Sequence, residues 1–229
     1  MRYYAQMLYV VATPIGNLKD MTLRAIETLK TVDLILSEDT RETDKILREF
    51  GIEKQQISYR DQNHNKIIDY LIEQFKEGKT VALVSDSGTP LISDPGYKLV
   101  HDLRERGIMV ESIPGPSAII SALSISGLPT DKFIFLGFLP KSLSKRKELL
   151  KKYGETEATL TIYESPYRVR RLLHEIQEAL GERKIFIAKD LTKIHEKTFY
   201  GNLSELISNE EQITEKGEYM VLISKSEEK

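Results

Sequence analysis

The residues best suited to hold a ligand lie in one loop, from Ser85 to Gly96. The loop follows the apolar run Val81–Val84, which predicts a buried strand, and a helical pattern begins after it at Tyr97. It holds two glycines, two prolines and several hydroxyl and carboxylate side chains. Glycine lets a backbone approach a ligand closely, and proline stiffens the chain. Most strand-to-helix connections have about two to six residues, so this longer segment predicts a binding loop.

Prolines also mark the ends of other predicted strands, at Pro14, Pro114, Pro140 and Pro166. The carboxyl ends of parallel strands share one edge of a sheet, so the loops that follow them should converge. A cleft between two such domains is a natural place for a small molecule. The residues alone therefore predict a small-ligand cleft and leave the chemistry of the ligand open.

The common cofactor signatures are absent from the sequence. No two glycines are separated by one residue, so the dinucleotide-binding glycine pattern is missing, and there is no phosphate-binding Gly-x-x-x-x-Gly-Lys. The chain has no cysteine, which excludes disulfides and thiolate metal sites. Its four histidines have no metal-ligand spacing, so we expect no metal, and nothing resembles a serine nucleophile elbow.

Composition narrows the class of protein further. The net charge is −2 and the charged residues, 30% of the chain, are mixed along it, which is not the overall footprint of a nucleic-acid binder. No apolar run approaches the roughly 20 residues of a membrane span, and the N-terminus is too short in apolar length for a signal peptide. We therefore expect a cytoplasmic protein without membrane contact.

Strand and helix patterns alternate along the chain. This alternation predicts an α/β fold with a mainly parallel sheet and helices on both faces. Short strands near the end predict a mixed sheet in the second half. The segment that follows the fifth strand, Pro114–Ser117, is the best candidate for a boundary between an N-terminal domain, 1–114, and a C-terminal domain, 115–229. The strands are expected at 7–12, 34–36, 57–59, 81–84, 109–113, 133–138, 159–163, 184–188, 198–201 and 218–224.

Several long motifs occur in an order that resembles one known family. They are Ala12–Asp20, Ser37-Glu-Asp-Thr-Arg41, Val84–Gly96, Ile113-Pro-Gly-Pro-Ser117, Gly137-Phe-Leu-Pro-Lys141, Tyr163-Glu-Ser-Pro-Tyr-Arg168 and Leu191-Thr-Lys193. Over nearly the whole chain the sequence is similar to the ribosomal RNA small subunit methyltransferase I family of the tetrapyrrole methylase superfamily. The resemblance implies two α/β domains with a cofactor cleft between them.

The same resemblance implies an activity. Members use S-adenosyl-L-methionine to methylate the ribose 2′-oxygen of a cytidine in the decoding region of 16S ribosomal RNA. The expected partners are the small ribosomal subunit and a second copy of the chain in a homodimer, with no DNA. Two alternatives stay open: a methyltransferase of another substrate, such as a tetrapyrrole, and a non-catalytic RNA-binding assembly factor.

The resemblance also assigns cofactor-binding residues in both halves of the chain. Packing beneath the cleft is nearly as good an interpretation for Leu191 and Met220. The assigned residues are Pro14, Asp86, Gly88, Thr89, Ile92, Ser117, Ala118, Tyr163, Leu191, Thr192 and Met220.

Methyl transfer to a ribose hydroxyl also needs a nearby base or cation, because the hydroxyl is a poor nucleophile at neutral pH. We expect Lys193 to stabilise the alkoxide and Glu164 to orient the substrate; Asp86, Asp190 and Glu196 are further candidates. The alternative role for all of them is a surface ion pair.

A basic cluster could contact RNA phosphates, and such contacts weaken with salt. It comprises Lys141, Lys145, Arg146, Lys147, Lys151 and Lys152, and a second group comprises Arg168, Arg170 and Arg171. With the resemblance, we expect RNA contact mainly from Lys141, Arg146 and Arg168. Without it, a solvated helix face is the better interpretation.

The sequence departs from the family pattern in a few places. Arg60-Asp-Gln-Asn63 stands where the family usually has His-x-His-Asn, and Lys189 replaces an arginine, losing a bidentate donor. Ser87 stands where alanine is usual before Gly88. Many members also carry a C-terminal extension beyond the equivalent of Lys229. The lack of this extension puts the RNA contacts that it would make in doubt, and not the cofactor site; the effect of the altered 60–63 segment on RNA recognition stays open.

Overall fold

The computed structural model describes residues 6–225. The chain divides into two compact units, Met1–Ser117 and Ala118–Lys229, called unit 1 and unit 2 below. The division falls after Ser117 rather than after residue 114. Hydrogen bonds tie the intervening segment to unit 1, since the Thr89 hydroxyl donates to the Pro116 carbonyl at 3.1 Å.

Unit 1 is built on a five-stranded sheet in the order β3-β2-β4-β1-β5. Every pairing in it is parallel, as the alternation of strands and helices predicts. Parallel strands buried on both faces read as continuous apolar runs, which explains why all of β4 is buried. The strands are β1 (Met7–Val11), β2 (Leu34–Ser37), β3 (Gln56–Ser58), β4 (Thr80–Val84) and β5 (Met109–Ile113).

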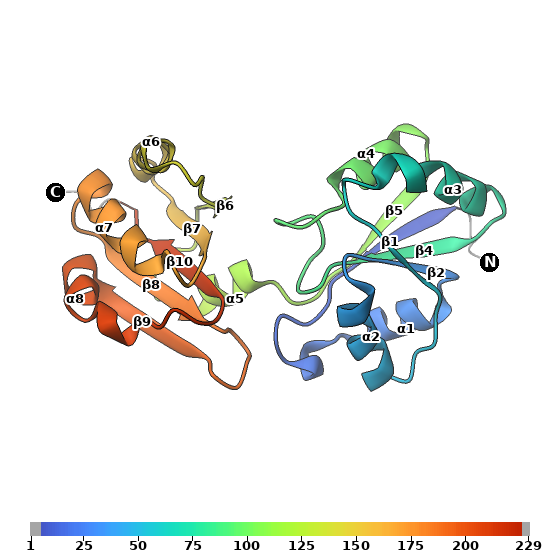
Figure 1. Ribbon diagram of the computed structural model, residues 1–229, viewed down its shortest axis with the longest axis horizontal. Helices are drawn as coiled ribbons and strands as arrows, with labels where there is room; N and C mark the ends of the chain where they lie inside the picture. The colour runs from blue at the N-terminus through green and yellow to red at the C-terminus, as the bar shows by residue number, and fades with distance from the viewer. Residues whose placement is uncertain (1–5, 226–229) are drawn as a thin grey trace. The chain divides into compact units, whose positions relative to one another are not determined.

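Two pairs of helices cover the two faces of this sheet (Figure 1). Side chains of β4 alternate between them, because successive residues of a strand point to opposite faces. Val81 and Leu83 pack with α3 (His64–Lys76) and α4 (Tyr97–Glu105). Ala82 and Val84 pack with α1 (Leu23–Thr31) and α2 (Thr40–Glu49). A short 3-10 helix, η1 (Leu18–Asp20), precedes α1.

Unit 2 has a mixed sheet in the order β6-β7-β10-β8-β9. Only β6 and β7 pair in parallel. The last strand, β10, lies between β7 and β8 and runs antiparallel to both. The strands are β6 (Phe133–Phe138), β7 (Thr159–Glu164), β8 (Lys184–Lys189), β9 (Lys197–Asn202) and β10 (Tyr219–Ile223).

The helices of unit 2 are unevenly shared between the faces of its sheet. The main core joins Leu160 and Ile162 of β7 to α6 (Leu143–Gly154), α7 (Val169–Leu180) and α8 (Leu203–Ser208). The helix α5 (Ala118–Ile125) contacts β10 (Figure 1). A 3-10 helix, η2 (Glu210–Gln212), follows α8. Among residues 6–225, no helix has the length and apolarity needed to cross a membrane.

Candidate cofactor and substrate sites at the strand ends

In unit 1 the loops after β1 and β4 are joined by backbone hydrogen bonds. Thr13 and Gly88 form an isolated antiparallel bridge, with N–O distances of 2.8 and 3.1 Å. The Thr13 hydroxyl also donates to the Ser85 carbonyl at 3.2 Å. These contacts fix the start of the loop from Ser85 to Gly96 against the first strand.

This pair of loops occupies the topological switch point of the sheet. The strands β1 and β4 are neighbours, yet β1 leads to α1 on one face and β4 leads to α4 on the other. Ligands of open α/β sheets bind at such points, outside the carboxyl ends of the strands. The geometry therefore supports the predicted ligand loop independently of any motif.

The backbone of the loop is held in unusual conformations. Leu91 and Ser93 have φ values of 73° and 70°, in the left-handed region that side chains other than glycine rarely adopt. Gly96 has a φ of 131°, and a Cβ there would lie 2.9 Å from Leu83 Cδ2. Strained residues of this kind persist where the surrounding structure imposes them, often at ligand sites.

The predicted cofactor residues of unit 1 gather around this loop. Pro14 and Gly88 are buried, and a Cβ on Gly88 would lie 3.2 Å from Ile15 Cγ2. Thr89 bonds to the Pro116 carbonyl, next to Ser117. Ile92 is 44% exposed, so its apolar side chain is available to a ligand.

Carboxylates collect at the same edge of the sheet. Burial raises the pKa of Asp94 to about 6, and the charges of Glu38 and Asp86 add to the shift. Burial also raises the pKa of Asp86, the predicted cofactor residue, and that of Glu38. Like charges held together in partial burial are relieved by a cation or a hydrogen-bond donor. This edge therefore suits a ligand with positive charge or hydroxyl groups.

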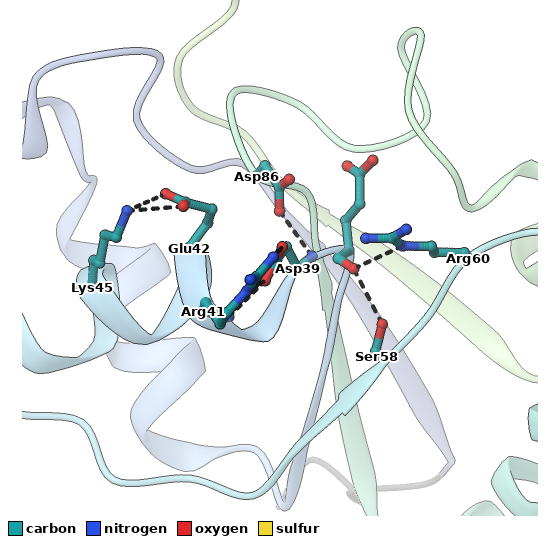
Figure 2. A network of polar contacts seen from close by, with 8 residues as sticks. Asp39, Arg41, Glu42, Lys45, Ser58, Arg60 and Asp86 are labelled. Carbon is teal, nitrogen blue, oxygen red and sulfur yellow. Dashed lines mark hydrogen bonds and ion pairs between the residues drawn. The ribbon is translucent and has the colours of Figure 1, made fainter.

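A network of polar contacts connects Asp86 with the residues after β2 and β3 (Figure 2). Asp86 Oδ1 accepts from the backbone N–H of Asp39 at 2.9 Å. Asp39 in turn pairs with Arg41 at 2.6 Å, and Arg60 Nε donates to the Glu38 carbonyl at 3.4 Å. The loops that follow β2, β3 and β4 are thus tied to one another.

The segment that departs from the family pattern supports the ligand loop. Asp61 Oδ1 accepts from the backbone N–H of Gly96 at 3.3 Å, where the loop ends. Asn63 bonds to the Arg60 amide at 2.9 Å and to the Ser58 carbonyl at 2.9 Å. Asp61 therefore positions the end of the loop from outside it, and Asn63 closes the turn that holds Asp61.

In unit 2 the predicted residues lie on neighbouring strands and on the loop after β8. Met220 of β10 pairs with Tyr163 of β7 on one side and with Ala188 of β8 on the other. Met220 and Leu191 are buried at 3% and 9% exposure, which matches the packing role left open for both. Ala118, the remaining predicted residue, is the first residue of α5 and is half-buried.

The loop after β8 is strained in the same way as the loop of unit 1. Asp190 and Thr192 have φ values of 52° and 65°. Asp190 Oδ1 accepts from the Glu218 amide at 3.0 Å, and a Cβ on Gly217 would lie 2.5 Å from Asp190 Oδ2. The Thr192 hydroxyl oxygen is buried and has no hydrogen-bond partner among residues 6–225. A buried polar atom of this kind calls for a ligand or water.

The two predicted catalytic side chains differ in environment. Lys193 Nζ lies 2.9 Å from Glu218 Oε1 and its side chain is 34% exposed, so the amine can reach a substrate. The Glu164 side chain is fully buried; its Oε1 accepts from Arg168 Nη2 at 2.6 Å and from the Ser165 amide at 2.7 Å. Oε2 of Glu164 is buried without a partner in the described part of the chain.

The predicted RNA contacts are also unequal. Lys141 is exposed, and Arg168 keeps 26% of its side chain exposed. Arg146 is 1% exposed, and its guanidinium pairs with Glu175, which is 5% exposed. The expectation that Arg146 faces RNA is therefore corrected: its charge is buried between α6 and α7.

Sequence reasoning missed two residues of these sites. Asp94 lies inside one of the family motifs, and its raised pKa comes from burial and from Glu38 and Asp86, which only the folded chain brings near it. Lys189 was noted only as a replacement for arginine, yet it is 11% exposed and pairs with Asp190 at 3.1 Å. Within residues 6–225, no group of three or more His, Cys, Asp or Glu side chains could hold a metal ion.

Comparisons with known proteins agree with this architecture. The family model described as Tetrapyrrole (Corrin/Porphyrin) Methylases matches residues 7–207. The chain is 46% identical over 220 residues to the ribosomal RNA small subunit methyltransferase I of Thermotoga maritima, covering 96% of this chain and 99% of that protein. It is 48% identical to the protein of the same name from a Synechocystis species, covering 95% of this chain and 78% of that protein.

Solved structures share the fold at low sequence identity. Diphthine synthase aligns with a TM-score of 0.72 at 15% identity, over 97% of this chain and 91% of that one. A uroporphyrin-III C-methyltransferase from Thermus thermophilus, complexed with S-adenosyl homocysteine, aligns with a TM-score of 0.63 at 18% identity. That alignment covers 95% of this chain and 97% of the other. The two-sheet α/β architecture is thus that of this superfamily.

Proposed function

The chain belongs to the ribosomal RNA small subunit methyltransferase I family, and on this premise we propose that it methylates 16S ribosomal RNA with S-adenosyl-L-methionine as methyl donor. The observation that carries the proposal is the 46% identity to the Thermotoga maritima protein, which extends over nearly the full length of both chains. The strand-end loops support it. The loop after β4 in unit 1 holds strained residues and carboxylates with raised pKa values. The loop after β8 in unit 2 holds strained residues and a buried Thr192 hydroxyl oxygen that has no partner among residues 6–225.

The residues present fit this cofactor. At the switch point of unit 1, a Cβ on Gly88 would lie 3.2 Å from Ile15 Cγ2, so glycine keeps the loop clear of that side chain. The carboxylates of Glu38, Asp86 and Asp94, whose pKa values are raised, suit a cationic ligand with ribose hydroxyls. In unit 2, the Thr192 hydroxyl, which has no partner within the described residues 6–225, offers one hydrogen bond. Asp86, Gly88 and Thr89 would therefore hold the cofactor in unit 1, and Thr192 in unit 2.

When bound, S-adenosylmethionine supplies an electrophilic methyl group and leaves as the neutral thioether. The residues of the chain have two tasks: to align the ribose oxygen and to manage its proton. We assign part of the second task to Lys193: its partly exposed ammonium would stabilise the negative charge on the 2′-oxygen while the hydroxyl proton passes to solvent water. Glu164 has an indirect task, because its buried carboxylate fixes Arg168 at the start of α7.

We further propose that the acceptor is the ribose 2′-oxygen of a cytidine in the decoding region. The test is a map of ribose methylation in small-subunit RNA from cells with and without this protein. A single 2′-O-methylcytidine that disappears with the protein supports the proposal. An unchanged map, or methyl transfer to a tetrapyrrole instead, would refute it.

The role of Lys193 is tested by Lys193→Ala. Loss of the cation should lower kcat about a hundredfold, within the range for removing one group that stabilises a developing oxyanion, while cofactor affinity by calorimetry stays near that of the wild type. Lys197→Ala, an exposed lysine in β9, is the matched control and should keep its activity. An unchanged kcat in Lys193→Ala removes this residue from the mechanism.

We also propose that the protein is cytoplasmic, because the proposed RNA substrate is cytoplasmic. We propose in addition that it is a homodimer. Two isoleucines of the short helix α5, Ile120 and Ile125, are 56% and 52% exposed, which suits burial against a second copy. Sedimentation equilibrium should show a dimer for the wild type and a weaker one for Ile120→Glu. A monomeric wild type would contradict this part of the proposal.

A further inference from the structure

Two aromatic side chains at the ends of β6 and β7 form an exposed stack. We propose that Phe138, backed by Tyr163, is a platform on which one unstacked nucleobase of the RNA substrate is held. The inference rests on the proposed function and names the residue that would hold a base near the methylated ribose.

Within unit 2 the ring of Tyr163 contacts the rings of both Phe138 and Phe135. Tyr163 and Phe138 are adjacent across the β6–β7 pair, with ring centroids 5.6 Å apart and a tilt of 44°. On its other side Tyr163 meets the edge of Phe135, at 5.0 Å and 77°. These are favourable aromatic geometries, so the platform is stiff before any ligand arrives.

An irregularity in β6 creates this arrangement. Residues 135 and 138 would face opposite sides of a regular strand, because side chains alternate. The register shifts between Phe135 and Gly137, and Gly137 has a φ of 62°. The bulge therefore brings Phe138 to the side of Phe135, against Tyr163. Bulges re-aim side chains in this way next to functional sites.

The ring of Phe138 remains open to a ligand. It is 59% exposed although it ends a strand whose core-facing residues are packed. Rings stack on nucleobases without regard to sequence, because every base has a π-face.

The charges around the platform favour RNA over an apolar occupant. Lys141 is exposed three residues after Phe138, and Arg168 is partly exposed in the loop after Tyr163. A stacked base between flanking phosphates would engage both the ring and the amine of Lys141, whereas an apolar protein surface would offer that amine no counter-charge.

A tryptophan reporter tests the contact directly, because the chain contains no tryptophan. Phe138→Trp should retain the stack and lose fluorescence when a single-stranded oligoribonucleotide with the decoding-region sequence binds. Phe133→Trp is the matched control, since Phe133 lies at the other end of β6 and is 42% exposed. Equal quenching in the two variants overturns the proposal. Quenching by S-adenosylhomocysteine alone also overturns it. A Phe138→Trp emission that changes with protein dilution overturns it as well, because burial of the ring against a second copy would cause such a change.

Kinetics on small ribosomal subunits supply an independent measurement. Phe138→Leu keeps the apolar volume and removes the ring, so KM for the subunit should rise about fivefold or more, the loss expected for one base stack. Its kcat and the salt dependence of KM should stay unchanged, whereas Lys141→Ala should reduce the salt dependence. An unchanged KM in Phe138→Leu overturns the platform and leaves the proposed function standing. A wild type inactive on small-subunit RNA would refute the proposed function itself.

Discussion

Replacing the buried Arg146 by methionine should destabilise unit 2. The Nε of Arg146 donates to Glu175 Oε2 at 2.8 Å, and both side chains are at most 5% exposed. The variant would leave the Glu175 carboxylate with Arg171 alone, whose side chain is 59% exposed and donates to Oε1 at 2.8 Å. Breaking a buried pair by removing one partner costs about 3–5 kcal/mol, because a charge is left without compensation. We expect a loss in this range in the free energy of unfolding.

Chemical denaturation followed by circular dichroism, analysed with separate transitions for the two units, measures this loss. Lys145→Met, an exposed neighbour on the same helix, should change stability by less than about 0.5 kcal/mol. The double variant Arg146→Met/Glu175→Leu should recover most of the loss, since apolar replacements of buried pairs are often neutral. A cost below about 1 kcal/mol in Arg146→Met, or a fall in the salt dependence of RNA binding in a folded variant, would refute the buried role.

Two further predictions concern the loop of unit 1. Burial raises the pKa of Asp94 from its usual 3.8 to about 6, so its ionisation disfavours the folded state and stability falls as pH rises between about 4 and 6. A shift of about two pKa units corresponds to at most about 3 kcal/mol. The free energy of unfolding of Asp94→Asn should therefore exceed that of the wild type by up to this amount at pH 8. At pH 4 the two free energies should be equal. A pH-independent difference in urea denaturation would contradict the shift. Gly88→Ala and Gly51→Ala should both lose about 1–2 kcal/mol, because each needs a positive φ. Calorimetry should show weaker binding of S-adenosylmethionine only in Gly88→Ala, since a Cβ meets nothing within 4 Å at Gly51; equal affinities would exclude Gly88 from the cofactor site.

The architecture of unit 1 was predictable because its signals are local. Most of its strands include a short apolar run, and its helices have periodic apolar faces, so the alternation of the two patterns indicates parallel strands. The positions of the loops then follow, since parallel strands place their carboxyl ends on one edge. The unusual length of the 85–96 segment then indicated which of these loops binds a ligand.

The arrangement of unit 2 was less predictable because it depends on contacts distant in sequence. A mixed sheet was expected, but no local signal inserts β10 between β7 and β8. The same limit explains Arg146. Basic residues fill α6, and its pattern does not reveal which of them faces the acidic Glu175 of α7, 29 residues away. Only the packed pair of helices distinguishes a buried arginine from solvated lysines.

The altered segment from Arg60 to Asn63 argues for retained function rather than loss of it. In a non-catalytic protein that had lost the ligand site, this segment would not need to bind the ligand loop. Asp61 instead accepts the Gly96 amide at 3.3 Å, and Asn63 closes the turn after β3. Behind it, the buried His64 joins Tyr59 to Asp102 of α4 through bonds of 3.0 Å each. The segment thus fixes both the end of the loop and the helix that follows it. Although Asp61 is expected to act through the loop and not by contact with the cofactor, Asp61→Ala should therefore weaken the binding of S-adenosylmethionine. An unchanged affinity for S-adenosylmethionine would favour the assembly-factor alternative.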